Sequence, residues 1–177
     1  MFFNGSIVGR TLLKMCFGIS LAGFFLTAQE SLAAGRLTLN FNPDWKFIKA
    51  DPSGAQRPGF NDATWTTVST PHTFNDVDTF DDLSPGGMHG ETNQWSGRTW
   101  YRKTFTLPES MKGRNVYVEF EAVRQVADVY LNGHLLGASK NGFVPFGFDL
   151  TPYVRFGETN VLAVMCDNRF MISQVGG

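Results

Sequence analysis

The stretch ADVYLNGHLLG, residues 127–137, carries the strongest signal for the fold. Its first half alternates apolar and polar residues, and a period of two is typical of a half-buried β-strand. Asn132 and Gly133 then stand between two apolar runs, and both residue types tolerate the positive φ angles of a type I′ turn. The stretch therefore predicts a tight β-hairpin with its turn at Asn132-Gly133.

Further short segments with strand-like composition lie on both sides of this hairpin. Val116, Val118 and Phe120 share one face of an alternating run, and the polar residues between them share the other. No segment shows a convincing helical period, so two apolar sheet faces must be buried against each other. The sequence predicts an all-β fold, a jelly-roll-type β-sandwich. The other expected strands are 37–40, 45–48, 65–68, 100–107, 146–150 and 160–166.

The N-terminal residues 1–34 have the pattern of a secretory signal peptide. Arg10 and Lys14 supply the positive charges, residues 15–28 are uncharged and mostly apolar, and Ser31-Leu32-Ala33 offers small residues for cleavage. An uncleaved membrane anchor is the alternative, although a transmembrane helix needs about 20 apolar residues. We expect export to the periplasm or the extracellular space, without stable membrane insertion after cleavage. Residues 35–177 then form one β-sandwich domain.

Composition excludes some classes of function. The formal net charge is -1 and basic runs are absent, so no electrostatic footprint for nucleic acid exists. Of the two cysteines, Cys16 lies in the predicted leader, which leaves Cys166 with no disulfide partner. Cys166 sits in an apolar run, where we expect a buried, unreactive thiol.

Motifs for hydrolysis or metal binding are missing. There is no Gly-x-Ser-x-Gly elbow, and the three histidines, His72, His89 and His134, do not have metal-ligand spacing. An acidic cluster does not fit an EF-hand loop, so a solvated loop is favoured over calcium. We expect no metal, no cofactor and no catalytic residue. The cluster consists of Asp76, Asp78, Asp81 and Asp82, and carboxylates that could form a glycosidase pair are Asp78, Asp82, Glu91 and Asp167.

Residues 70–98 form a long polar segment with residue types that suit a sugar. Sugar hydroxyls bind to Asp, Asn, Arg and His, and the C–H faces of a sugar stack on aromatic rings. A second polar set, Asp167-Asn168-Arg169, follows the last expected strand. An equally good alternative from the residues alone is that Trp95 packs beneath its loop and Arg98 pairs with a nearby carboxylate. The candidates in the loop are His89, Glu91, Asn93, Trp95 and Arg98.

Five blocks in order resemble a known family over most of residues 37–170. The chain resembles the N-terminal jelly-roll domain of glycoside hydrolase family 2, which includes β-galactosidases, β-glucuronidases and β-mannosidases. No single block is decisive, but their common order makes chance similarity improbable. The blocks are Trp65 to Asp76 around Pro71-His72, Trp100-Tyr101-Arg102, Phe120 to Gly133, Pro145 to Thr151, and Asn160 to Asn168.

The resemblance implies a galactose-binding-domain-like sandwich that packs beside a catalytic (β/α)8 barrel. It makes Asp167 and Asn168 the best candidates for sugar contacts, followed by the loop that contains His89, Glu91, Asn93 and Trp95. The family's acid/base and nucleophile glutamates lie downstream on the barrel, and after Asn168 the sequence departs from the family's Gly-Ile-Tyr-type continuation.

We therefore expect the carbohydrate-binding N-terminal domain of a retaining exo-glycosidase, β-galactosidase-like, truncated before the barrel and inactive alone. The alternative is a stand-alone exported lectin-like carbohydrate-binding module. A third possibility is a structural sandwich used for protein association. The sequence leaves the sugar, the linkage and the oligomeric state open.

Overall fold

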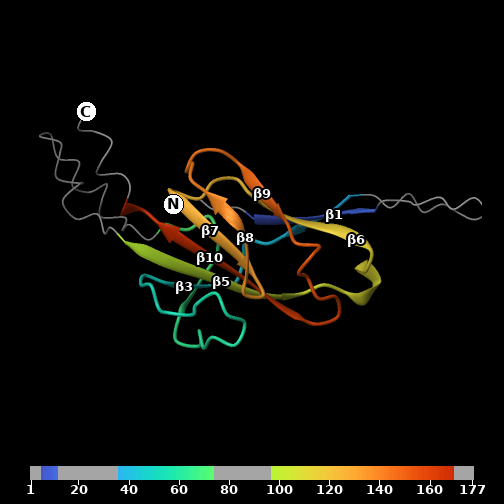
Figure 1. Ribbon diagram of the computed structural model, residues 1–177, viewed down its shortest axis with the longest axis horizontal. Helices are drawn as coiled ribbons and strands as arrows, with labels where there is room; N and C mark the ends of the chain where they lie inside the picture. The colour runs from blue at the N-terminus through green and yellow to red at the C-terminus, as the bar shows by residue number, and fades with distance from the viewer. Residues whose placement is uncertain (1–4, 12–35, 74–96, 170–177) are drawn as a thin grey trace, which may run out of the picture.

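The computed structural model describes residues 5–11, 36–73 and 97–169, which form two antiparallel β-sheets (Figure 1). In the described residues helix is limited to short 3-10 turns, so the predicted all-β sandwich is confirmed. The first sheet has the order β2 (Leu37–Asn40), β1 (Gly5–Thr11), β6 (Arg114–Phe120), β9 (Phe146–Asp149). The second has the order β4 (Thr66–Val68), β3 (Trp45–Ile48), β5 (Arg98–Thr106), β10 (Thr159–Asp167), β7 (Val126–Leu131), β8 (His134–Ser139).

The predicted hairpin is present between β7 and β8. Asn132 and Gly133 have φ angles of 51° and 87°, the positive values that the Asn-Gly pair was expected to supply. Asn132 is also buried, and its side-chain amide donates hydrogen bonds to Tyr153 O and to Asn160 Oδ1, both at 2.9 Å. The turn is therefore tied to the start of β10.

The main core lies between the two sheets. Val116, Val118 and Phe120 of β6 are at most 1 % exposed, which confirms the predicted alternation. They belong to one cluster with Val129 of β7 and Val164 of β10 from the facing sheet. Cys166 is buried in the same cluster, and burial raises the pKa of its thiol, as expected for an unreactive cysteine.

A second, smaller core covers the outer face of the β5–β10 pair. The connection 49–65 folds over this face and packs Ala55 and Trp65 against Trp100, Ala163 and Met165. As a result both faces of β10 are buried, and its residues 160–167 are all buried. A strand that is buried on both faces typically has a nearly continuous apolar sequence instead of an alternating one.

Arg102 of β5 holds this connection in place. Its side chain is 2 % exposed and donates to one carboxylate, Asp62 Oδ2, at 2.8 Å. A guanidinium has five N–H donors, and the other hydrogen bonds of Arg102 all go to backbone carbonyls. The carbonyl acceptors are those of Ala55, Arg57, Pro58 and Phe60.

Residues 5–11, which fall inside the predicted signal peptide, form strand β1. β1 is antiparallel to both of its neighbours and pairs Gly5 with Phe120 and Thr11 with Arg114. This pairing describes the unprocessed chain, so cleavage of the leader stays a prediction. The described part of the chain contains no helix long and apolar enough to cross a membrane.

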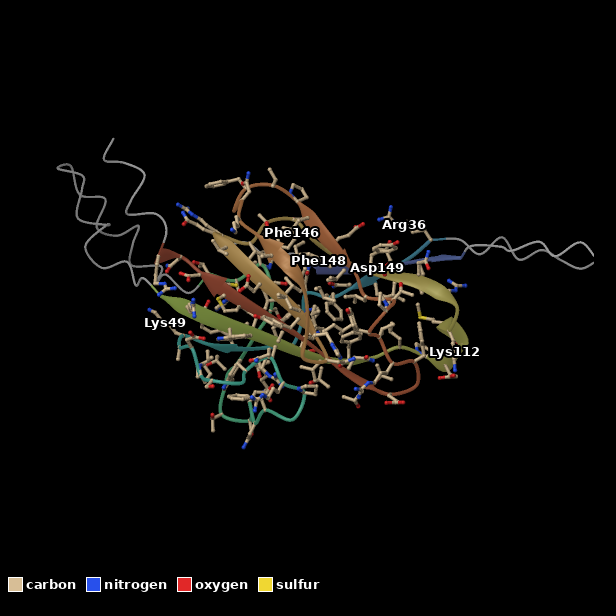
Figure 2. All side chains as sticks on the ribbon, viewed as in Figure 1. Arg36, Lys49, Lys112, Phe146, Phe148 and Asp149 are labelled. Carbon is tan, nitrogen blue, oxygen red and sulfur yellow. The ribbon has the colours of Figure 1, made fainter. Side chains whose placement is uncertain are left out.

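The two ends of the sandwich differ in their elements. At one end, called the site end below, β10 terminates at Asp167, β5 begins at Arg98, and β6 terminates at Phe120. Figure 2 labels Lys49 close to this end and Lys112 near the opposite end. The segment 74–96 belongs between β4 and β5 and lies outside the described residues.

Candidate functional site

The sequence candidates Asp167 and Asn168 lie at the site end, where β5 and β10 pair. Asp167 is directly opposite Arg98 in the sheet register, and Arg98 Nε donates to Asp167 Oδ2 at 3.2 Å. The Asp167 side chain is 6 % exposed, whereas that of Arg98 is 43 % exposed. The carboxylate is therefore an inner group of the site, and the guanidinium is an outer one.

Arg98 is also bound by a carboxylate from the connection 49–65. Its Nη1 donates to Asp51 Oδ2 at 3.1 Å, and the other oxygen of Asp51 accepts the indole N–H of Trp100 at 2.8 Å. These hydrogen bonds, that from Trp100 first, lower the pKa of Asp51. Asp51 thus joins the second core to the site end.

A second guanidinium closes over Asp167. Arg169 Nε donates to both carboxylate oxygens, at 2.9 and 3.1 Å, and Nη2 donates to Oδ2 at 2.5 Å. The hydrogen bonds from Arg169, more than those from Arg98, lower the pKa of Asp167 to about 2. Asp167 is therefore ionised at neutral pH.

Asn168 anchors the segment that leads into β5. Its side-chain oxygen accepts the backbone N–H of Gly97 at 2.7 Å, and its own backbone N–H donates to Gly97 O at 3.2 Å. At the other boundary of segment 74–96, His72 Nδ1 lies 2.8 Å from the Tyr101 hydroxyl, and burial lowers the pKa of His72. Both boundaries of this segment are thus fixed to the β5 region.

The loop candidates His89, Glu91, Asn93 and Trp95 lie outside the described residues, as does the acidic cluster Asp76, Asp78, Asp81 and Asp82. The structure therefore does not place them. For Arg98, the alternative prediction of a carboxylate partner is confirmed twice, by Asp51 and Asp167. His134 stacks on Tyr153 near the hairpin turn, at the opposite end of the sandwich.

The charged groups at the site end are better suited to binding a polar ligand than to catalysing a reaction. Asp167 is enclosed by donors, so the exposed groups that remain for a ligand are the two guanidiniums and Asp51, whose side chain is 43 % exposed. Arginine donates two parallel hydrogen bonds to a carboxylate or to neighbouring oxygens. Within the described ranges, His, Cys, Asp and Glu do not form a group of three that could hold a metal ion.

Sequence reasoning did not identify Asp51 as a site residue. It lies 47 positions before Arg98, and it carried no motif. A cavity of about 460 Å³ lies elsewhere, on the other sheet, between Tyr117–Glu121 and Pro145–Gly147. It does not include Asp167 or its partners.

Comparison with known proteins gives consistent matches. Residues 61–174 match the family model described as the glycosyl hydrolase 2 galactose-binding domain-like domain. A β-glucuronidase from Formosa agariphila is 62 % identical over 133 residues, which are 75 % of this chain and 14 % of that protein. A β-galactosidase from Bacteroides ovatus is 37 % identical over 80 % of this chain and 16 % of its own length.

A solved structure, that of a β-glucuronidase from glycoside hydrolase family 2, superimposes with a TM-score of 0.68. It is 61 % identical, and the match covers 73 % of this chain and 14 % of that one. The chain thus spans about one seventh of the length of these relatives. The matched family model, the relatives and the sandwich agree, and the chain belongs to glycoside hydrolase family 2 as an N-terminal, galactose-binding-like domain.

Proposed function

We propose that the chain is the sugar-contacting N-terminal domain of a longer, exported exo-glycosidase. The observation that carries the proposal is the cluster at the site end, where Asp167, its two arginine partners and Asn168 meet the boundary of segment 74–96. A catalytic (β/α)8 barrel in the same polypeptide supplies the two carboxylates for retaining hydrolysis. The domain itself supplies substrate contacts and packs beside the barrel.

The proposed substrate is a β-glucuronoside. The relative at 62 % identity carries that activity in its name, and the site end presents two exposed guanidiniums. In the described contacts Arg98 uses Nε and Nη1, which leaves Nη2 to bind a uronate carboxylate. A β-galactoside, which the sequence suggested, is the second candidate and is favoured by the Bacteroides ovatus relative.

Export is part of the proposal and rests on the N-terminal sequence. Arg10 and Lys14 precede an apolar stretch that ends in small residues. The exported product would work in the periplasm or the extracellular space. Expression of the chain with its leader, followed by mass measurement of the exported product, tests this part: a product that still contains residues 1–34 would contradict it.

A domain exchange tests the sugar-contacting role. The matching 133 residues of the Formosa agariphila β-glucuronidase are replaced by those of this chain, and hydrolysis of 4-nitrophenyl β-glucuronide is measured. We expect the chimera to be active. Arg98→Gln in the chimera should raise KM for the glucuronide by about tenfold, the value of one charge-assisted contact, and change KM for the galactoside little.

The matched control is Arg155→Gln, because Arg155 is an exposed arginine between β9 and β10, away from Asp167. It should leave both KM values unchanged. A folded chimera that lacks all turnover while its parent is active would refute the role. An equal loss for glucuronide and galactoside would reject the uronate assignment and leave general sugar contact.

The stand-alone lectin-like module gains no support from the comparisons, because the relatives described above are much longer glycosidases. Calorimetry with glucuronate and galactose on the 177-residue chain distinguishes the two functions. Heat of binding without any barrel would favour the module. Its absence at millimolar sugar is the result expected for a domain whose pocket is completed by a barrel.

A further inference from the structure

The connection 49–65 covers only part of the outer face of the second sheet. It packs on outer side chains of β5 and β10, and in Figure 1 it lies on the β3–β5 side of the sheet, away from β8. The outer face of β7 and β8 extends beyond it. Asp128 and Tyr130 point outward there, because they alternate with buried residues of β7, and Leu135 of β8 is 56 % exposed.

Tyr130 and Leu135 give this face an apolar surface. The ring of Tyr130 lies 5.8 Å from that of Trp100, at an interplanar angle of 32°, and Leu135 is the register partner of Tyr130 on the other side. Trp100 is 6 % exposed, so Tyr130 and Leu135 carry the apolar surface that solvent reaches. An aromatic ring beside an aliphatic side chain is a surface on which the C–H groups of a pyranose ring can pack.

Two polar groups beside this surface are unpaired. In the described part of the chain, neither the Tyr130 hydroxyl nor the Asp128 carboxylate makes a hydrogen bond or an ion pair. Among the described residues Thr99 Oγ1 is the one buried side-chain polar atom without a partner, so both groups reach solvent. Partial burial, more than the charge of Asp128, raises the pKa of Tyr130. Its hydroxyl therefore stays protonated at neutral pH and can donate a hydrogen bond.

The charge on this face selects the kind of sugar. Asp128 is the one acidic residue of β7 and β8, and these two strands contain no Lys or Arg. Its register partner is Ala138, a side chain too short to cover the carboxylate. A carboxylate accepts hydrogen bonds from sugar hydroxyls and repels the carboxylate of a uronate. The outer face of β7 and β8 therefore favours a neutral pyranose.

This face adjoins the site end. Asp128 is opposite Met165 in the sheet register, two residues before Asp167 on β10. The charge of Arg98 acts on the Tyr130 hydroxyl, which places the two side chains within electrostatic reach of each other. A ligand that is held by Arg98 can therefore extend across β10 onto β7.

We propose that Asp128 and Tyr130 form a second sugar subsite, which takes the neutral pyranose next to the sugar bound at Arg98. Tyr130 and Leu135 pack on the C–H face of that ring, and Asp128 accepts its hydroxyl groups. The inference rests on the proposed function, because it takes a sugar at Arg98 as its neighbour. It makes the substrate an oligosaccharide in which a uronate is linked to a neutral sugar.

A titration of the 177-residue chain tests the subsite without a barrel. Cellobiose, a neutral β-linked disaccharide, is added to concentrations well above the millimolar range, and the amide NMR signals are followed. We expect saturable shift changes centred on Val126–Leu131 and His134–Ser139, the strands that carry the subsite. Glucuronate should leave these amides unchanged. An absence of changes with cellobiose, or equal changes with glucuronate, would overturn the proposal.

Conservative variants assign the contacts in the same titration. Asp128→Asn keeps the size of the side chain and should raise Kd for cellobiose about fivefold, the difference between a charge-assisted and a neutral hydrogen bond. Tyr130→Phe keeps the ring beside Trp100 and should raise Kd about threefold through the lost hydroxyl. Glu158→Gln, at an exposed position before β10, is the control and should leave Kd unchanged. If the control weakened binding as much as Asp128→Asn did, the subsite would be refuted.

The chimera described above separates the subsite from the proposed function. Asp128→Asn should raise KM about fivefold for a disaccharide of glucuronate β-linked to galactose, and should leave KM for 4-nitrophenyl β-glucuronide unchanged. Arg98→Gln should raise both KM values. An equal rise for both substrates with Asp128→Asn would give Asp128 a structural role and overturn the subsite alone. A folded but inactive chimera whose β7–β8 face still binds cellobiose would refute the role of Arg98 and leave the subsite standing.

Discussion

Arg98 and Arg102 lie four residues apart on the same face of β5, yet they are used differently. Arg102 is 2 % exposed, and apart from Asp62 all of its acceptors are backbone carbonyls. Arg98 is 43 % exposed, and both of its partners are carboxylates. The two residues share a strand and a charge, so the difference must come from what folds over each one.

Arg102 is enclosed because the connection 49–65 bends around its guanidinium. The carbonyls of residues 55–60 cannot find strand partners in this irregular segment, and an unpaired buried carbonyl is costly. The arginine donates to four of them, and the centre of the Phe60 ring lies 5.5 Å from its guanidinium carbon. Exchange of these acceptors for a ligand would require the connection to unfold.

Arg98 stands at the beginning of β5, and in the described contacts the connection 49–65 reaches it through the Asp51 carboxylate alone. Its carboxylate partners hold it in position, but water and solutes reach its outer nitrogens. On this face of β5, an arginine whose guanidinium is surrounded by backbone carbonyls stabilises the fold. An arginine that is held by side chains alone remains available to bind a ligand. Substitutions of Arg102, Asp167 and Asp51 test that division.

Arg102→Lys should cause the largest loss of stability. Lysine has three donors on one nitrogen and cannot reach the separated acceptors, so Asp62, the buried carbonyl of Ala55 and partly buried carbonyls beside it lose a partner. We expect the free energy of unfolding in urea to fall by about 3–5 kcal/mol. Arg155→Lys, at an exposed position, should stay within about 0.5 kcal/mol of the parent. Equal effects would show that the carbonyl contacts of Arg102 do not stabilise the connection.

Asp167→Asn should cost less stability than Arg102→Lys. The amide keeps the size of the side chain but loses the charge that Arg98 and Arg169 share. Because Arg169 is half exposed and screened by solvent, we expect a loss of about 1–2 kcal/mol in the free energy of unfolding. The isosteric change Glu158→Gln at an exposed site is the control. A loss as large as that for Arg102→Lys would place Asp167 among the structural groups.

The same carboxylate gives the domain a defined acid sensitivity. The pKa of Asp167 in the folded protein, about 2, is below the ordinary value of 3.8 for an aspartate, chiefly because Arg169 donates to its carboxylate. A depressed folded pKa contributes stability that is complete above the unfolded pKa and is lost as pH falls from about 4 to 2. The difference in unfolding free energy between the parent and Asp167→Asn should therefore shrink over that range. A difference that stays constant from pH 6 to pH 2 would contradict the assigned ionisation.

Local patterns predicted the sandwich because strands such as β6 and β7 have one apolar face each. The period of two at Val116, Val118 and Phe120 and the Asn132-Gly133 turn follow from backbone geometry, and both are confirmed. The expected strands matched within two residues, for example Arg98–Thr106 against the predicted 100–107. Such features depend only on neighbours in the chain.

The partners of the charged residues could not be predicted in the same way. Asp51 and Arg98 are 47 positions apart, and Arg102 meets carbonyls that leave no trace in a sequence pattern. Asp167 and Asn168 were noted as polar residues after the last expected strand, and the family resemblance then made them the best candidates for sugar contacts. Strand β1 was not expected, because residues 5–11 belong to a leader pattern and their pairing is entirely long-range.

Asp51→Asn should have the smallest effect, because it tests the most exposed contact in the cluster. Asparagine retains an oxygen that can accept the indole N–H of Trp100, so only the ion pair with Arg98 is lost. An exposed pair of this kind contributes about 0.2–1 kcal/mol, and the difference should disappear in about 1 M salt, where charges are screened within about 3 Å. Asp51→Ala removes the acceptor for Trp100 as well. It should lower the free energy of unfolding further, and part of that loss should persist at high salt.

If the two variants were equally destabilised and equally salt-sensitive, the Trp100 contact would contribute nothing. Asp51 would then matter only through Arg98, and the second core would not be tied to the site end through it.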